Sequence, residues 1–247
     1  MNGTKLLSSI TDNLNEMGLA RMSESLMNAY KSPDFLNKDR LELISEMVND
    51  EYQIRISKKI ESRLRHAGLL GSPETIDSCV DSIEREYKPN SIVSMLKNLD
   101  FIANGQNVCI LGASDSGKTY LARALAIEAC RFYKVEYHHC TRLLENVAAL
   151  KSVDFVKYSR KIKALIKADL LVLDDFLLNS IMDEQELKVL FSILEGRIEA
   201  KASTVVCSQR QPESWTSMMM NDAVSADAIL KRITRHYTVV INCRSDN

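Results

Sequence analysis

Residues 107–130 read NVCILGASDSGKTYLARALAIEAC and hold the strongest local signal in the chain. Within them, residues 112–119 match the phosphate-binding pattern G-x-x-x-x-G-K-[ST] at every fixed position. The apolar run before this loop predicts a buried strand, and the run after it predicts an amphipathic helix. A chance match in a glycine- and serine-rich turn is the alternative, and the flanking strand and helix argue against it. The segment therefore predicts a strand–loop–helix unit that binds a nucleotide.

The residue types in this loop suit phosphate chemistry. Glycines allow backbone N–H groups to surround phosphates, which then lie at the N-terminus of a helix. We expect Lys118 to reach the β- and γ-phosphates of ATP and the Thr119 hydroxyl to ligate Mg²⁺. Asp115 is an unusual acid in a loop for anions; it either points to solvent or lowers the affinity for nucleotide. The predicted nucleotide-binding residues are Gly112, Ala113, Ser114, Asp115, Ser116, Gly117, Lys118, Thr119 and Tyr120.

A second segment, ADLLVLDDF at residues 168–176, places two acids after an apolar run. A buried strand of this kind delivers its last carboxylates to the sheet edge where ligands bind. We expect Asp174 to hold Mg²⁺ and Asp175 to orient and deprotonate the attacking water. A strand that ends in an Asp-rich turn is the alternative. Asp175 is shorter than a glutamate would be, which favours slow hydrolysis.

Two further polar positions follow later predicted elements. Gln209 comes after a strand at 203–208 and is placed to contact the γ-phosphate or the lytic water, although an ordinary strand-to-loop turn is equally consistent with it. Arg232 and Arg235 are three residues apart and share a face of a predicted helix. Arg232 could reach the γ-phosphate bound by a neighbouring subunit, as arginine fingers do. Solvated surface charge is the alternative for this arginine.

The chain divides into two regions by pattern. The first 90 residues carry helical apolar spacing and no convincing strand, so we expect a helical domain at 1–90 and an α/β domain at 91–247. In the second region short apolar runs alternate with helical ones, which predicts a five-stranded parallel sheet covered on both faces. The predicted strands lie near 106–111, 134–139, 169–174, 203–208 and 237–243. The predicted helices lie near 117–131, 141–150, 153–167, 183–200 and 223–235.

Composition narrows the class of protein. The 247 residues have a formal net charge of −1, so any nucleic-acid binding must come from local patches. No apolar run reaches 18 residues, and we expect no membrane span. The six cysteines are scattered singly, which indicates reduced thiols and a cytoplasmic protein.

Four blocks, in this order, resemble a known family: GASDSGKTYLARALAIEAC, LLVLDDF, TVVCSQRQPESW and ADAILKRITRHY. They resemble the IstB-like AAA+ transposition helper ATPases of insertion sequences, which are related to DnaC helicase loaders and DnaA initiators. The likeness covers most of the chain and implies an AAA+ P-loop NTPase fold after an all-α N-terminal domain. It implies that Lys118 and Thr119 belong to Walker A, Asp174 and Asp175 to Walker B, with Gln209 as sensor 1 and Arg232 as the arginine finger. Three positions depart from the usual family pattern: Ala113-Ser114-Asp115 in the loop, Asp175, and Gln209.

The resemblance also implies a function. It predicts an ATP- and Mg²⁺-dependent ATPase that assembles as a homo-oligomer on duplex DNA and assists an IstA-like transposase. The first alternative is a DnaC-like helicase loader, which has the same ATPase core and acts on single-stranded DNA. The second is a nucleotide-gated scaffold with little hydrolysis, which Asp115 and Asp175 make plausible.

Two basic helical segments are candidates for sequence-nonspecific contact with DNA phosphates. In residues 55–67, basic side chains gather opposite an apolar face, and in residues 151–167 six basic residues stand against one acid. Solvated helix faces are the alternative for both segments. The DNA-contact candidates are Arg55, Lys58, Lys59, Arg63, Lys157 and Lys161.

Overall fold

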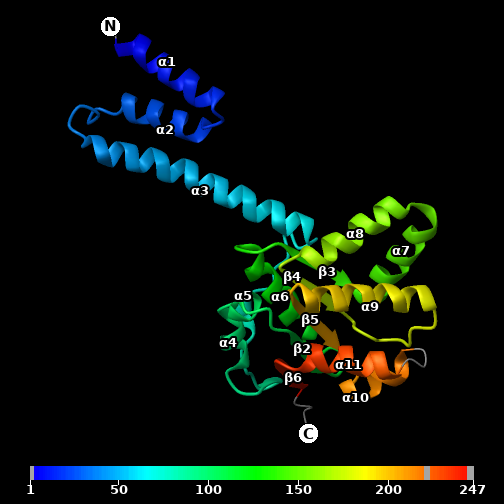
Figure 1. The fold of residues 1–247 in the computed structure, drawn as a ribbon. Coiled ribbons are helices and arrows are strands. Elements are labelled where there is room, and N and C mark those ends of the chain that lie inside the picture. The colour runs from blue at the N-terminus through cyan, green and yellow to red at the C-terminus, as the bar shows by residue number, and fades with distance from the viewer. Residues whose placement is uncertain (1–2, 220–222, 244–247) are drawn as a thin grey trace. The chain divides into compact units, whose positions relative to one another are not determined.

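The computed structural model of this chain describes residues 3–219 and 223–243 (Figure 1). It divides into two compact units, Met1–Ser62 and Arg63–Asn247, so the division falls well before the predicted boundary at residue 90. Residues 63–90 belong to the larger unit because Ala67, Leu69 and Tyr87 are buried in the same core as the sheet. Beyond residue 66 their regular elements are short, a 3₁₀ turn at Ile76–Ser78 and a strand at Arg85–Lys88, so their sequence carries no clear strand signal.

The N-terminal unit is built from helices around a small core. Leu14, Leu26 and Met47 are its buried apolar residues. The buried Glu51 accepts hydrogen bonds from the backbone N–H groups of Arg21 and Met22, at 3.1 and 3.3 Å, and so satisfies the first turn of the second helix. The helices are α1 (Gly3–Glu16), α2 (Ala20–Lys31) and α3 (Arg40–His66), and α3 extends across the division between the units.

The larger unit contains a six-stranded sheet of order β1-β6-β2-β5-β4-β3. All five predicted strands are confirmed, and they pair in parallel. The prediction of five strands is wrong by one, because β1 adds an antiparallel edge strand on β6. Its sequence, REYK, has one buried residue and no apolar alternation, so it gives no strand signal. The strands are β1 (Arg85–Lys88), β2 (Val108–Gly112), β3 (Val135–His139), β4 (Leu170–Asp174), β5 (Ser203–Ser208) and β6 (Tyr237–Cys243).

Helices cover both faces of this sheet (Figure 1). Alternate residues of β2 enter different cores: Val108 and Ile110 pack with α6, while Cys109 and Leu111 pack with the helices of the other face. The parallel strands are therefore apolar on both sides, as their sequences predict. The helices are α4 (Ile92–Lys97), α5 (Asp100–Ala103), α6 (Lys118–Cys130), α7 (Cys140–Val153), α8 (Phe155–Lys167), α9 (Glu184–Glu199), α10 (Pro212–Trp215) and α11 (Ala223–Thr234), with 3₁₀ turns at Ile76–Ser78 and Thr216–Met218.

A buried arginine fixes the end of α8 against β5. Arg197 in α9 is 1% exposed. Burial lowers the pKa of Arg197 to about 10, well above neutral pH, so the guanidinium stays charged. It donates hydrogen bonds to the carbonyl oxygens of Leu165, Ile166, Ala168 and Ser203 and to the Thr204 hydroxyl. This arginine satisfies backbone acceptors at the end of α8 that would otherwise be buried without a donor.

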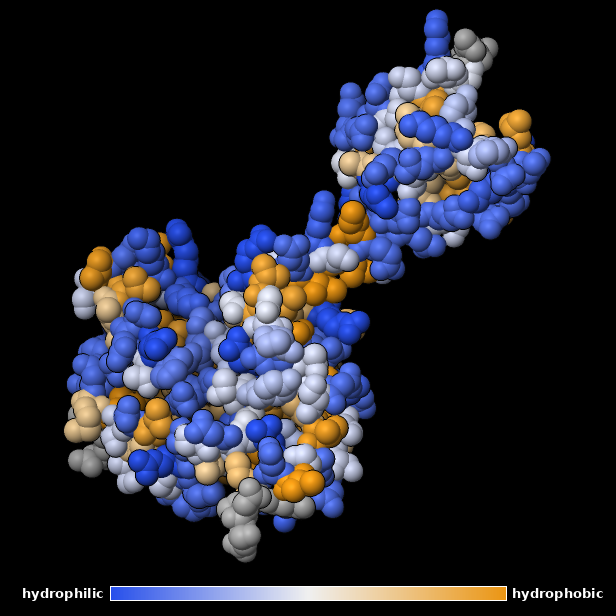
Figure 2. Space-filling view, turned by 180° about the vertical axis from the view of Figure 1, so that it is seen from behind, coloured by the Kyte–Doolittle hydropathy of each residue, from blue (hydrophilic) through white to orange (hydrophobic). Residues whose placement is uncertain are grey.

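Hydrophilic side chains dominate the molecular face shown in Figure 2, and apolar ones gather there in small patches. No helix in the described part of the chain is long and apolar enough to cross a membrane.

Candidate functional site

The predicted phosphate loop connects the end of β2 to the first turn of α6. Its two fixed glycines are required by the backbone. A Cβ on Gly112 would lie 2.5 Å from the Ser116 Oγ and 2.7 Å from the Ile241 carbonyl oxygen, closer than real Cβ contacts. Gly117 precedes the helix with φ of 96°, a conformation that favours glycine. The backbone of the loop is therefore tightly turned just before the N-terminus of α6.

Polar groups inside the loop fit an anion. The Lys118 side chain is buried, and its Nζ donates to the carbonyl oxygen of Ala113 within the loop. The Ser116 Oγ is buried with no hydrogen-bond partner among the described residues. A buried hydroxyl and a buried ammonium beside a helix N-terminus form a site that favours phosphate.

Asp115 and Tyr120, two of the predicted nucleotide-binding residues, differ from Lys118 and Ser116 in their surroundings. Asp115 is exposed, with φ of 60°, and the Ser114 hydroxyl donates to its carboxylate at 3.4 Å. The Tyr120 hydroxyl lies 3.4 Å from the backbone nitrogen of Thr75, outside the loop. The carboxylate of Asp115 thus has access to solvent, and the Tyr120 side chain does not face the phosphate site.

The two Walker segments meet at the carboxyl end of the sheet. The Thr119 Oγ1 donates to Asp174 Oδ1 at 3.2 Å, although 55 residues separate them in the chain. Asp174 is the last residue of β4, and its side chain is largely buried. A hydroxyl and a carboxylate at this separation form an oxygen pair of the type that Mg²⁺ binds in phosphate-transferring sites. The structure therefore brings together both predicted Mg²⁺ ligands.

Tyr137 is a site residue that sequence reasoning missed. Its hydroxyl donates to the second carboxylate oxygen, Asp174 Oδ2, at 2.6 Å. Burial, and then the neighbouring charge of Asp174, raises the pKa of the Tyr137 phenol, so it remains a donor. The parallel register pairs Tyr137 with Val172 and so brings the phenol close to the end of β4. Tyr137 therefore holds Asp174 in a fixed orientation.

Asp175 begins the turn that leaves the sheet. Its φ of 51° lies in the left-handed region, which costs free energy for a residue other than glycine. The His139 Nε2 lies 3.3 Å from Asp175 Oδ2, and the backbone N–H of Asp175 donates to Asp174 Oδ1 at 3.1 Å. The strained turn thus separates the two carboxylates: Asp174 faces Thr119, and Asp175 faces His139 at the end of β3.

The turn after Asp175 is attached to the neighbouring strand. The Phe176 backbone N–H donates to the Cys207 carbonyl oxygen at 2.7 Å, and the Ser208 hydroxyl donates to the Phe176 carbonyl oxygen at 2.8 Å. Phe176 also meets the buried Trp215 edge to face, with ring centroids 5.0 Å apart. Gln209 follows Ser208 directly, so the end of β5 is fixed beside the Asp175 turn.

The side chains of Gln209 and Arg232 do not contact Thr119, Asp174 or Asp175 through hydrogen bonds. Both residues are exposed, and neither side chain makes a hydrogen bond or ion pair with a described residue. Arg232 lies in α11, where its carbonyl oxygen accepts from Asn107 Nδ2 at 3.2 Å. Thr119, Asp174 and Asp175 therefore lie together within one chain, whereas the Arg232 side chain is exposed on α11.

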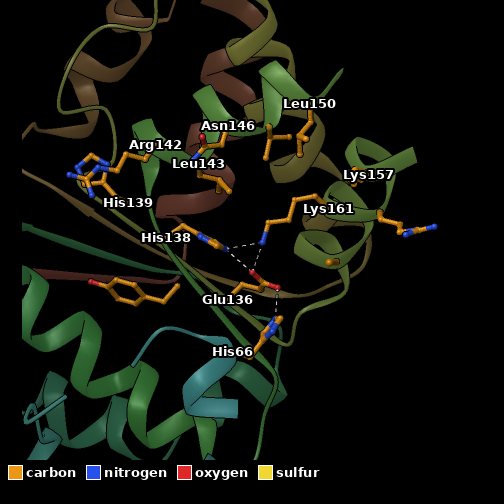
Figure 3. Close-up of a pocket in the computed structure, with 14 residues that line it drawn as sticks. His66, Glu136, His138, His139, Arg142, Leu143, Asn146, Leu150, Lys157 and Lys161 are labelled. Atoms are coloured by element: carbon orange, nitrogen blue, oxygen red, sulfur yellow. Dashed lines mark hydrogen bonds and ion pairs between the residues drawn. The ribbon is translucent and has the colours of Figure 1, made fainter. Parts of the chain in front are cut away.

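A basic cavity of about 680 Å³ lies between β3, α7 and α8 (Figure 3). Lys157 lies at its rim and also pairs with Asp154 at 3.3 Å. Lys161 points into the cavity, where its Nζ lies 2.9 Å from Glu136 Oε2. The other lysine, arginine and histidine side chains lining the cavity are His66, His138, His139, Arg142 and Arg160, in addition to Lys157 and Lys161. Among the described residues that line the cavity, four lysine and arginine side chains stand against one acid, Glu136, so the cavity is basic.

Glu136 binds three of the side chains that line this cavity. It is 5% exposed and contacts His66 at 2.9 Å, His138 at 2.7 Å and Lys161 at 2.9 Å. Burial alone would raise the pKa of Glu136, but the hydrogen bonds from His138, Lys161 and His66 outweigh it and hold the pKa well below its usual range. The carboxylate is therefore ionised at neutral pH and fixes three cationic or titratable groups.

The basic segment at residues 55–67 is largely used within the protein. Arg55 pairs with Glu51 at 2.6 Å and donates to the Gly18 carbonyl oxygen at 2.8 Å. Arg63 donates to the Cys130 and Arg131 carbonyl oxygens and so satisfies the C-terminal end of α6. Of the predicted DNA-contact residues in this segment, Lys58 and Lys59 are exposed and make no hydrogen bond or ion pair with a described residue.

The fold and the phosphate loop define a class of protein: a P-loop nucleotide-binding protein. A family model described as IstB-like ATP binding protein matches residues 11–246. An insertion sequence ATP-binding protein of Sinorhizobium fredii is 30% identical over 224 residues, covering 90% of this chain and 88% of its own length. The IS232 ATP-binding protein of Bacillus thuringiensis is 28% identical over 240 residues, covering 94% and 90%. The chain belongs to the IstB-like ATP-binding protein family.

Solved structures confirm the fold. The AMPPCP-bound DnaA of Aquifex aeolicus superposes with a TM-score of 0.56 at 22% identity, over 70% of this chain and 51% of DnaA. The DnaC helicase loader superposes with a TM-score of 0.54 at 16% identity, over 68% of this chain and 97% of DnaC. The predicted AAA+ architecture is therefore confirmed.

Proposed function

We propose that this protein is an ATP-hydrolysing helper of DNA transposition, which assembles on duplex DNA and assists the transposase of an insertion sequence. The observation that carries the proposal is the contact between Thr119 and Asp174, because it joins the phosphate loop to the second carboxylate segment. The role in transposition is supported by membership of the IstB-like family over nearly the whole chain, because the relatives are insertion sequence ATP-binding proteins.

The residues of the site suggest a division of labour in hydrolysis. The backbone of residues 112–119 and Lys118 would hold the phosphates, and Thr119 with Asp174 would hold Mg²⁺, which neutralises charge on the phosphates when bound. Asp175 would accept a proton from the attacking water, with His139 keeping its carboxylate in place. Its reach is one methylene shorter than that of a glutamate, so we expect slow turnover.

Arg232 would complete the site of a neighbouring subunit. Its side chain is exposed and makes no hydrogen bond or ion pair with a described residue, so it can reach a γ-phosphate bound by another copy. Gln209, at the end of β5, would contact the same γ-phosphate or the lytic water. This arrangement makes ATP the link between subunits and predicts that assembly requires nucleotide.

DNA binding is assigned to the basic cavity of Figure 3 and its rim. Arg142, Lys157 and Arg160 are exposed around it, and such a set attracts phosphates through release of counterions. Lys161 is partly neutralised by Glu136 and would act mainly by positioning the cavity wall. Lys58 and Lys59 form a second, smaller candidate in the N-terminal unit. Neither set offers a pattern that reads bases, so the proposed binding is sequence-nonspecific.

Fluorescence anisotropy of a labelled random duplex, with and without ATP and Mg²⁺, tests this proposal. We expect cooperative binding with ATP, loss of it in Lys118→Ala, and weaker binding in Lys157→Ala combined with Arg160→Ala. Phosphate release measured in parallel should vanish in Lys118→Ala. Binding confined to single-stranded DNA would instead support a helicase loader. Nucleotide-dependent DNA binding without phosphate release would support a scaffold.

A further inference from the structure

The edge strand β1 brings a cation to the phosphate loop. Because β1 runs antiparallel to β6, its first residue lies at the carboxyl edge of the sheet, where the loop also lies. Arg85 pairs in register with Cys243, while Gly112 of the loop pairs with Ile241 of the same strand β6. The Arg85 backbone is held there by Ser82, whose hydroxyl accepts from the Arg85 N–H at 3.1 Å.

The guanidinium of Arg85 lies directly on Gly117. A Cβ added to Gly117 would be 2.7 Å from Arg85 Cζ, 2.9 Å from the NH1 nitrogen and 3.0 Å from Nε. Any side chain at residue 117 would therefore collide with the guanidinium. The contact depends on a fixed glycine of the phosphate-binding motif, immediately before Lys118.

Among the described residues, the guanidinium of Arg85 has no anionic partner. Its Nε is buried without a hydrogen-bond acceptor, and it makes no ion pair with a described carboxylate. Its neighbours Cys79 and Tyr87 are neutral. Burial raises the pKa of Cys79 to about 11, and Tyr87 and Arg85 offset this only in part. Burial also raises the pKa of the Tyr87 phenol, and its hydrogen bond with Arg85 offsets this only in part. A buried cationic donor without a counter-charge is costly unless a ligand supplies one.

We propose that Arg85 is a phosphate ligand of the bound nucleotide, in addition to Lys118 and the backbone of the loop. The inference rests on the proposed nucleotide binding and adds to it a residue outside the motif. Gly117 adjoins the part of a P-loop that surrounds the α- and β-phosphates, so Arg85 is assigned to these and not to the γ-phosphate. An arginine donates several N–H groups in a plane, which suits two phosphate oxygens at once.

Titration of fluorescently labelled ADP and ATP against the full chain tests the assignment. Arg85→Met keeps the apolar packing on Gly117 and removes the charge, and we expect it to weaken both nucleotides about tenfold. Arg85→Lys should restore a large part of that loss. Lys88→Ala is the matched control, because Lys88 lies on the same strand, is exposed and pairs with Glu86. Its affinity should equal that of the wild type. A cooperative thermal transition without nucleotide in each of the four proteins shows that all of them are folded.

The outcomes separate this inference from the proposed function. If the wild type binds neither nucleotide, the proposed function itself fails. Should the wild type bind while Arg85→Met binds equally well or more tightly, Arg85 is not a ligand and the inference is overturned. A loss seen with ATP and absent with ADP would also overturn it, since it would place the contact at the γ-phosphate.

Discussion

The two units of this protein differ sharply in how they bury apolar side chains. The larger unit has two extensive cores, one on each face of the sheet, and strands that are apolar on both sides. The N-terminal unit buries Leu14, Leu26 and Met47, while large apolar residues such as Leu36 and Leu41 stay exposed. Since burial of apolar area is the main source of stability, the larger unit should be robust and the N-terminal unit marginal. The ATP site lies in the robust unit, which suits a site that depends on fixed geometry.

The largest expected effect is on the stability of the larger unit, and it follows from replacing Arg197. Arg197→Leu leaves several buried carbonyl oxygens without a donor, and we expect a loss of about 4 kcal/mol in the free energy of unfolding. Urea unfolding followed by circular dichroism measures it. Lys188→Ala on the same helix is the control and should change stability by less than about 1 kcal/mol, because its pair with Glu184 is exposed. Equal effects of the two substitutions would contradict the structural role of Arg197.

A change in the small core should unfold the N-terminal unit alone. Leu26→Ala removes one of its three buried apolar side chains, at an expected cost of about 3 kcal/mol. We expect rapid proteolytic cleavage within residues 1–62 and an unchanged affinity for ADP. Leu36→Ala, at a position 91% exposed, should leave the cleavage rate unaltered. A fall in ADP affinity with Leu26→Ala would show that the two units are not energetically separate.

Bound nucleotide should increase the difference in stability between the two units, because it stabilises only the larger one. At a free ADP concentration of 100 times Kd, binding adds about 2.7 kcal/mol to the stability of the unit that binds it. We expect the thermal transition of the larger unit to rise and proteolysis within residues 1–62 to continue at the same rate. In Lys118→Ala the rise should be absent. Protection of residues 1–62 by ADP would reveal coupling between the units.

The smallest expected effect concerns acid stability. Glu136 has a lowered pKa in the folded state, so its contacts stabilise the fold above the ordinary glutamate value of 4.5 and this contribution is lost as pH falls through the folded-state pKa. Lys161→Ala should cost about 1–2 kcal/mol at pH 7, and the difference from the wild type should narrow only at pH values well below 4.5, where Glu136 becomes protonated in the folded state. Unfolding measured across this range gives both values. Lys163→Ala on the same helix should show no such pH dependence.

The sequence allowed prediction of those parts of the fold that repeat a strong local pattern. β2 and α6 follow from an apolar run, a glycine motif and good helix formers, and β4 follows from four apolar residues before Asp174. β1 could not be predicted, because its pairing with β6 depends on residues about 150 positions away and its own residues are mostly polar.

The candidate site was predictable to the same extent. Thr119 and Asp174 were predicted together, and their contact is observed. Tyr137 was missed because a tyrosine in a strand resembles ordinary core, and the register of β3 on β4 is what gives it a carboxylate partner. Arg55 and Arg63 look like solvated charges in sequence, yet both donate to carbonyl oxygens distant along the chain. Long-range partners of this kind leave no local signal.

Trp215 has a practical consequence. It is the single tryptophan of the chain and is fully buried against Phe176, which follows Asp175 directly. Its indole N–H donates to the Arg210 carbonyl oxygen at 3.1 Å, so the ring is also attached to the segment after Gln209. The protein thus carries an intrinsic fluorophore between two of its proposed catalytic positions. Changes in its emission would report movement of the turn that carries Asp175 without any added label.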